Sequence, residues 1–195
     1  HNHYGKDYSE SIQGRFIYST DGGKTFDKVS EIPHGKGVLA GDGRCTVDGD
    51  GNLLIYYWFF DLEGGKDLDN HRSISRDFGR TFEPAQPVEL HMQIVSPMYF
   101  DDDTFVLVYQ ERFSDKPGIK AALSYDGGMT FDTQNAVTIY GADSVPGTDN
   151  PFKSFDDYKF GYSTITKTSN NSALIMYWSK QKHGISTCAC EIEIV

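Results

Sequence analysis

An octapeptide that occurs three times constrains the fold of this 195-residue chain more than any other feature of its sequence. The copies span 19–26, 75–82 and 124–131, and each reads Ser-x-Asp-x-Gly-x-Thr-Phe. Their first residues lie 56 and 49 positions apart. Repetition at such a period is the signature of an architecture built from similar units, so the chain is predicted to fold as a series of them.

Each octapeptide is predicted to form a hairpin turn. Short runs rich in β-forming residues precede the three copies, at 15–18, 72–74 and 119–123, and an extended piece follows each of them. The aspartate can accept hydrogen bonds from nearby backbone amides, the glycine supplies a positive φ, and the phenylalanine can enter a core. No helix follows the glycines, which excludes a phosphate-binding loop. Asp21, Asp77 and Asp126 are therefore predicted to be structural.

Two further extended segments recur in each period, and none of them has a helical pattern. The pairs are 44–48 with 53–60, 93–100 with 104–110, and 162–168 with 173–180. The turn from Asp48 to Asn52 resembles a calcium loop, but Leu53 and Phe59 stand where such a loop needs Gly and Glu, so a hairpin turn is predicted. The repeating unit is thus a four-stranded antiparallel sheet of about 50 residues, the size of a propeller blade.

Composition excludes several classes of partner and cofactor. With 18 Lys and Arg against 28 Asp and Glu, and no basic block, the chain lacks the charge for binding nucleic acid. Its longest apolar runs, such as 53–60, fall far short of the roughly 20 residues that cross a bilayer. Cys45, Cys188 and Cys190 lack the number and spacing of a zinc site and are predicted to pack, so no metal or other cofactor is expected.

The octapeptides resemble the Asp boxes of the sialidase (neuraminidase) superfamily of β-propellers. Residues 161–166, followed by 173–178, are similar to the segment that opens the last blade of those proteins. The resemblance covers nearly the whole chain and implies an all-β propeller of four-stranded antiparallel blades. Residues 1–195 form one partial propeller domain in this interpretation, with blade portions at 12–32, 40–90, 93–140 and 158–195.

These portions amount to about three and a half blades, whereas the ring of the family has six. We therefore expect the chain to be the C-terminal part of a longer propeller. The missing blades would lie on a separate or absent segment, or be replaced by oligomer formation. A self-closed ring of four blades is the alternative.

In a propeller, the starts of the innermost strands and the ends of the second strands converge on one mouth of the central channel. An anionic substrate would be repelled by a net charge of −10 unless arginines received it, because the guanidinium group pairs with both oxygens of a carboxylate. Arg44 and Arg112 are the predicted anion clamp, with Asp42 and Gln93 as further substrate-binding residues. Other residues predicted near the mouth are Asp61, Ser96, Glu111, Asp157, Tyr162 and Lys180.

The family resemblance gives Tyr162 a catalytic role. Sialidases use a tyrosine at this Gly-Tyr-Ser position as the nucleophile, because a neutral phenol can approach an anomeric carbon that bears a carboxylate. A phenol with a pKa near 10 needs a base. The family glutamate is not found at 44–45 or 95–97, and one family arginine is missing at 56–60. Asp157 and Glu111 are the predicted substitutes that carry the proton.

The sequence therefore predicts a sialidase-like glycoside hydrolase that acts on a carbohydrate, exo-acting on an anionic sugar. One alternative is a glycan-binding or scaffold propeller without catalytic activity. Another is a polysaccharide lyase that uses tyrosine and histidine, for which His1, His3 and His71 are the candidates. Trp58 and Trp178 are either sugar platforms or packing residues.

Overall fold

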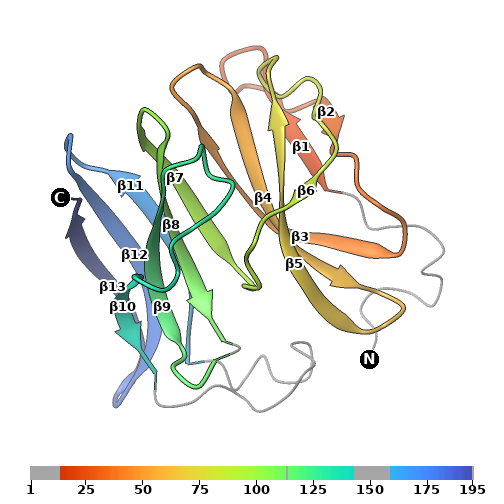
Figure 1. The fold of residues 1–195 in the computed structure, drawn as a ribbon. Helices are drawn as coiled ribbons and strands as arrows, with labels where there is room; N and C mark the ends of the chain where they lie inside the picture. Colours follow the sequence, from red (N-terminus) through yellow and green to blue (C-terminus); the bar gives the residue numbers. More distant parts are fainter. Residues whose placement is uncertain (1–13, 113, 143–158, 195) are drawn as a thin grey trace.

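The computed structural model describes residues 14–112, 114–142 and 159–194, and all regular secondary structure in this part is β-strand. The strands form four antiparallel sheets (Figure 1). The first sheet pairs β1 (Arg15–Tyr18) with β2 (Lys28–Glu31). The second contains β3 (Val38–Val47), β4 (Leu53–Asp61), β5 (Lys66–Ser75) and β6 (Gln86–Pro87). The third contains β7 (Val95–Asp101), β8 (Thr104–Glu111), β9 (Gly118–Ser124) and β10 (Val137–Gly141). The fourth contains β11 (Phe160–Lys167), β12 (Ser172–Gln181) and β13 (Gly184–Glu193).

The sheets stand side by side in chain order, and the first strands of the second, third and fourth sheets, β3, β7 and β11, lie closest together (Figure 1). Hydrogen bonds join these first strands: the Tyr99 amide donates to Thr46 Oγ1 (3.0 Å), and Ser96 Oγ donates to the Ser163 carbonyl (2.5 Å). The outer strands diverge, as in the blades of a propeller. The described residues form an open arc without a closed ring, and they contain no helix that is long and apolar enough to cross a membrane.

Apolar side chains fill the spaces between successive sheets. Side chains on β4 and β8 alternate between the two faces of their sheets, so each strand contributes to two cores. Ile55, Tyr57 and Phe59 face the first sheet, whereas Leu54 and Tyr56 face the third sheet. On β8, Phe105, Leu107 and Tyr109 face the second sheet, and Val106 and Val108 face the fourth. Burial on both faces explains the continuous apolar run of β4, which an alternating pattern would not predict.

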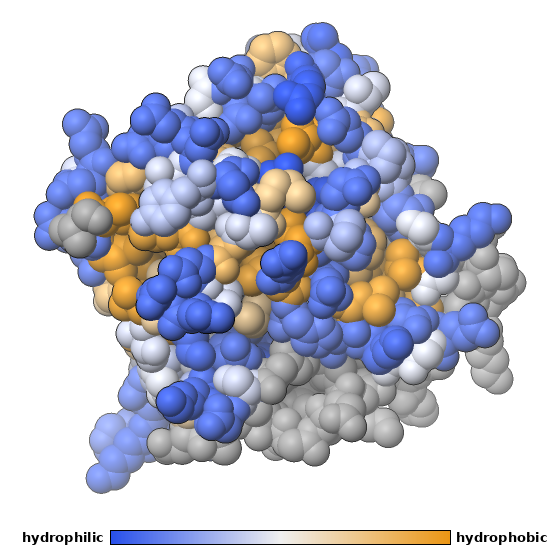
Figure 2. Space-filling model, viewed as in Figure 1, coloured by the Kyte–Doolittle hydropathy of each residue, from blue (hydrophilic) through white to orange (hydrophobic). Residues whose placement is uncertain are grey.

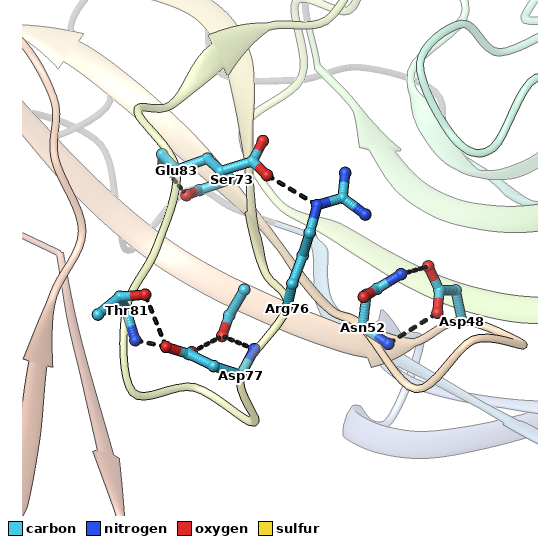
Figure 3. A network of polar contacts seen from close by, with 8 residues as sticks. Asp48, Asn52, Ser73, Arg76, Asp77, Thr81 and Glu83 are labelled. Atoms are coloured by element: carbon cyan, nitrogen blue, oxygen red, sulfur yellow. Dashed lines mark hydrogen bonds and ion pairs between the residues drawn. The ribbon is translucent and has the colours of Figure 1, made fainter.

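The three octapeptides join β1 to β2, β5 to β6 and β9 to β10 through loops with the same hydrogen bonds. In the second loop, Asp77 Oδ1 accepts from the amides of Arg80 (3.0 Å) and Thr81 (2.9 Å), and Oδ2 accepts from Thr81 Oγ1 (2.7 Å; Figure 3). Ser75 Oγ donates to Asp77 and accepts from the Gly79 amide. The predicted structural role of the aspartates thus has a specific form: each one closes its own loop.

These hydrogen bonds stabilise the charged form of each aspartate. The Ser19 hydroxyl is the largest cause for Asp21 and the Thr81 amide for Asp77, and the pKa of each falls to about 2. Burial acts in the opposite direction on Asp126, but the bonds from Thr130 and Ser124 outweigh it, and this pKa also falls to about 2. In the turn from Asp48 to Asn52, the Asp48 carboxylate likewise accepts from the Asn52 amide (2.8 Å) and from Asn52 Nδ2 (2.9 Å; Figure 3). This turn therefore forms the predicted hairpin.

Two octapeptide loops also fasten their sheet to the preceding one. In the second loop, the carbonyl of Gly79 accepts from Ser30 Oγ (2.5 Å), and the Phe82 ring meets the edge of Phe16. In the third loop, the Gly128 carbonyl accepts from the Tyr56 hydroxyl (2.7 Å) and the Gly127 carbonyl accepts from Arg72 (2.6 Å). The Phe131 ring packs on Tyr56 with centroids 6.1 Å apart. The repeat thus carries both the turn and the contact between sheets.

Candidate functional site

Two matching bulges interrupt the innermost strands of the second and fourth sheets. The pairing of β3 with β4 is irregular between Gly41 and Arg44, and that of β11 with β12 is irregular between Gly161 and Thr164. Within these bulges, Asp42 (φ 50°) and Tyr162 (φ 46°) adopt the left-handed conformation. A bulge redirects the side chain that it carries, and residues other than glycine in this conformation cluster at functional sites.

A glycine packed on a tryptophan precedes each bulge residue. Gly41 pairs with Trp58 across the sheet, and Gly161 pairs with Trp178. A Cβ atom on either glycine would come within 3.1 Å of the facing indole ring. Both tryptophans therefore lie directly beneath the bulges, with no room for a larger residue. Sequence reasoning missed this equivalence, although one signal was present: each glycine stands 17 residues before its tryptophan.

Two positively charged side chains lie near Asp42. Burial raises the pKa of its carboxyl group, and the nearby guanidinium groups of Arg44 and Arg112 oppose this shift. The Arg44 guanidinium donates to the Gly43 carbonyl (3.3 Å). Two arginines from different sheets, Arg44 on β3 and Arg112 at the end of β8, thus contribute to the electrostatic environment of one carboxylate.

Arg112 connects the third sheet to the fourth. Its guanidinium donates to Gln93 Oε1 and to the carbonyl of Phe160 (2.9 Å), and it lies 5.4 Å from the centre of the Phe160 ring. Phe160 begins β11, two residues before Tyr162. These interactions link four predicted site residues, Asp42, Arg44, Gln93 and Arg112, and Tyr162 follows Phe160 on β11. We call these five residues the mouth cluster. Tyr162 is 59% exposed, so its phenol is accessible to a ligand.

Other predicted site residues have different surroundings. Glu111 is buried, and alternation along β8 puts it on the side of Tyr109, whose pKa it raises in addition to the larger effect of burial. Asp61 accepts hydrogen bonds from the amides of Glu63 and Gly64 in the turn after β4. Ser96 joins β7 to β11 through its hydroxyl, and the Lys180 amide donates to the Lys159 carbonyl (2.6 Å).

The histidine that the structure describes among the lyase candidates, His71, is part of β5 in the second sheet. His71 stacks on Phe59 with ring centroids 4.1 Å apart, and burial lowers its pKa. His1, His3 and Asp157 lie outside the described residues. Within the described part of the chain, no group of three or more His, Cys, Asp or Glu side chains is placed to hold a metal ion.

Two buried polar side chains were not predicted from the sequence. Gln110 is fully buried, and neither atom of its side-chain amide has a hydrogen-bond partner among the described residues. Ser163, the residue after Tyr162, is also fully buried and its hydroxyl has no partner there. Such groups cost free energy, and their positions next to Glu111 and Tyr162 place this cost near the mouth cluster.

The antiparallel sheets are arranged as in part of a β-propeller, and comparisons with known proteins agree. The family model for the BNR/Asp-box repeat matches residues 17–28, which contain the first octapeptide. A protein of unknown function from Dyadobacter fermentans superposes with a TM-score of 0.65 at 19% identity, over 92% of this chain and 45% of that one. An intramolecular trans-sialidase from Ruminococcus gnavus superposes with a TM-score of 0.51 at 16% identity, over 84% and 33%. An α-L-arabinanase from Penicillium chrysogenum gives 0.50 at 14% identity, over 78% and 45%.

The chain therefore has the fold of the sialidase-like BNR/Asp-box propellers, as its octapeptides predicted. It spans less than half the length of each of these three proteins. A sequence comparison with curated proteins gives no significant match. At these low identities the likeness concerns the fold, and the activity has to be argued from the site.

Proposed function

We propose that the mouth cluster binds the carboxylate of an anionic sugar and that the protein is an exo-acting, sialidase-like glycoside hydrolase. The observation that carries this proposal is the pair of matching bulges, which present Asp42 and Tyr162 in the same strained conformation. Arg112 supports it, because this residue contacts the start of β11 and also acts on the pKa of Asp42. A phenol, a carboxylate and two guanidinium groups are the chemistry that such a substrate requires.

In this proposal the two arginines and the tyrosine of the cluster have different tasks. Arg44 and Arg112 attract the substrate carboxylate on a chain whose net charge of −10 otherwise repels it. The Tyr162 oxygen forms a bond to the anomeric carbon while the glycosidic bond breaks, and the phenolic proton passes to a carboxylate. A second carboxyl group gives its proton to the departing oxygen. Water then attacks the anomeric carbon and breaks the tyrosyl bond; it loses a proton to this second carboxylate, and the first carboxyl group returns its proton to the tyrosine oxygen, which restores the phenol.

The proton carriers of the proposal are Asp42, Glu111 and Asp157. Burial raises the pKa of Asp42, which makes its carboxylate a stronger base than an ordinary aspartate. Glu111 and Asp157 remain the substitutes expected from the sequence. The sheets would belong to blade portions 12–32, 40–90, 93–140 and 158–195, about three and a half blades of a six-bladed ring.

Hydrolysis of a fluorogenic aryl sialoside tests the catalytic part of the proposal. We expect turnover by the chain and a loss of at least about 100-fold in Tyr162→Phe, because phenylalanine cannot form the glycosyl bond. Tyr125→Phe is the matched control, since Tyr125 is 67% exposed in the third octapeptide loop. Equal turnover by Tyr162→Phe and the unaltered chain would remove Tyr162 from the mechanism.

Binding is measured separately through the only two tryptophans of the chain, which lie beneath the bulges. We expect N-acetylneuraminic acid to change their fluorescence and its uncharged methyl ester to change it much less. Arg44→Met should weaken the response to the acid by about 10-fold or more, because it removes a charged partner of the carboxylate. A response of equal affinity to acid and ester would contradict an anion site.

A glycan-binding propeller without catalytic activity is the second candidate. The observation that favours it is the number of carboxylates: among the described residues of the mouth cluster, Asp42 is the only one. Most glycoside hydrolases use two carboxyl groups, one on each side of the scissile bond. Saturable binding of the acid, without turnover of the sialoside or of a wider panel of aryl glycosides, would favour this candidate.

A further inference from the structure

Consecutive sheets of this chain meet through equivalent residues. Two residues of the later sheet enter the contact between the second and third sheets. They are Phe131, the last residue of the octapeptide (8% exposed), and Ala122, which lies two residues before the octapeptide starts (4% exposed). Leu54 (2%) and Tyr56 (0%) on the second strand come from the earlier sheet. The later sheet thus contributes its octapeptide side, and the earlier sheet contributes its second strand.

The first sheet has the octapeptide side of such a contact, but its apolar residues are uncovered. Phe26 and Ile17 occupy the repeat positions of Phe131 and Ala122, and they are 64% and 54% exposed. Val29, which pairs with Ile17 across the sheet, is also 54% exposed. We call Ile17, Phe26 and Val29 the leading face. In the second sheet the corresponding Phe82 is 8% exposed, so exposure is not a property of the repeat itself.

The last sheet has the second-strand side of such a contact. Trp178 and Trp58 have the same place opposite a bulge glycine, so Leu174 and Met176 on β12 correspond to Leu54 and Tyr56 on β4. Met176 is 44% exposed and Leu174 is partly exposed. In the space-filling view, apolar surface lies at the left of the molecule, on the side of the last sheet, as well as at its centre and right (Figure 2). We call Leu174, Met176 and Trp178 the trailing face.

We propose that two copies of this chain assemble head to tail, with the leading face of each copy covering the trailing face of the other. The two faces are the two halves of the contact that this chain makes between its own sheets, so they fit each other and not themselves. Two such contacts related by a twofold axis close a ring and leave neither face exposed.

The length of the arc supports a second copy as the occupant. The chain covers 45% of the Dyadobacter fermentans protein and 45% of the arabinanase, whose folds it shares. Two arcs therefore supply about the extent of one such protein. The contact is heterologous, and it closes at two copies when each arc supplies about half of the ring; an arc of another extent would give an open chain or a larger ring.

Light scattering coupled to size exclusion tests the assembly directly. We expect twice the chain mass of 21.9 kDa for the unaltered protein. Phe26→Asp and Met176→Asp each place a carboxylate in an apolar contact, so each variant should elute as a monomer. Tyr125→Asp is the control, because Tyr125 is 67% exposed in an octapeptide loop outside both faces, and it should remain a dimer. Far-ultraviolet circular dichroism checks that every variant is folded.

A mixture of the two variants distinguishes head-to-tail assembly from a symmetric contact. The trailing face of Phe26→Asp and the leading face of Met176→Asp are both intact, so the mixture should recover part of the dimer through one native contact. A monomeric unaltered protein would overturn the proposal and leave a sheet from another polypeptide as the occupant. A dimer that only one of the two variants disrupts would also overturn it, because that contact would use one face twice.

Discussion

At the scale of single residues, the octapeptide aspartates link the stability of the fold to acid pH. The pKa values of Asp21, Asp77 and Asp126 are about 2, below the ordinary value of 3.8 that the unfolded chain retains. A carboxyl group with a lowered pKa in the folded state stabilises the fold above the pKa of the unfolded state, and this stabilisation is lost as the pH falls toward the folded value.

We therefore expect the urea midpoint to stay nearly constant from pH 7 to about pH 4 and to fall between pH 4 and pH 2. Asp126→Asn should lower the midpoint at pH 7 and reduce the acid dependence, since the amide cannot accept all the bonds that Thr130 and Met129 donate. Asp115→Asn is the control, because Asp115 is an exposed carboxylate outside the octapeptide loops. An Asp126→Asn variant as acid-sensitive as the parent protein would contradict this origin.

The bulge residue Tyr162 gives a second prediction at this scale. A left-handed conformation costs an L-residue about 1–2 kcal/mol, and glycine escapes this cost. We expect Tyr162→Gly to be more stable than Tyr162→Ala by about 1 kcal/mol in urea denaturation. At Ile185, which is exposed on β13 and has no positive φ, the order should be reversed, with alanine more stable than glycine. If alanine were more stable than glycine at both positions, the bulge would not be strained.

At the scale of the elements, the phenylalanines of the second and third octapeptides, Phe82 and Phe131, contribute apolar contacts between sheets. Phe131 is 8% exposed and packs on Tyr56 in the core between the second and third sheets. Phe131→Ala should cost about 3–5 kcal/mol in the free energy of unfolding, measured in urea. Tyr125→Ala, an exposed position in the same loop, should stay within about 0.5 kcal/mol of the parent protein. Similar costs for both substitutions would exclude Phe131 as an anchor.

The boundaries of the strands agree with the prediction from the sequence at some elements and differ from it at others. The octapeptide turns and the second strands, such as Leu53–Asp61, follow the predicted ranges because hairpin residues and apolar runs mark them directly. The innermost strands were predicted to start at 44 and 162, whereas β3 begins at Val38 and β11 at Phe160. The difference comes from the bulges, because a residue with positive φ interrupts the alternation that identifies a strand.

At the scale of the whole molecule, the period of the repeat predicted the sheets, and the family resemblance supplied their radial arrangement. Neither could show which side chains meet across sheets. Arg112 lies near Asp42 because three sheets pack together. Glu111 faces the same side of β8 as Tyr109, and this side is set by the register of the strand. Such contacts are tertiary, so a pattern within one strand contains no information about them.

Whole-molecule cohesion also depends on buried hydroxyl groups that join the sheets. Tyr56 is fully buried in the second sheet and donates to the Gly128 carbonyl of the third (2.7 Å). Tyr56→Phe leaves this buried carbonyl without its donor, which should cost about 1–3 kcal/mol at pH 7. Burial also raises the pKa of Tyr56 to about 12, above the value of 10 expected for the unfolded chain.

A raised pKa stabilises the fold below the pKa of the unfolded state and ceases to do so as the pH rises through the folded value. The parent protein should therefore lose stability between pH 10 and pH 12, and Tyr56→Phe should lose less over the same interval because it has no phenol to ionise at this contact. Tyr125→Phe, which removes an exposed phenol, should keep the alkaline slope of the parent. If Tyr56→Phe and the parent lost stability in parallel up to pH 12, the phenol between the second and third sheets would not be the group that limits stability in alkali. Urea midpoints measured at half-unit intervals of pH distinguish the two outcomes.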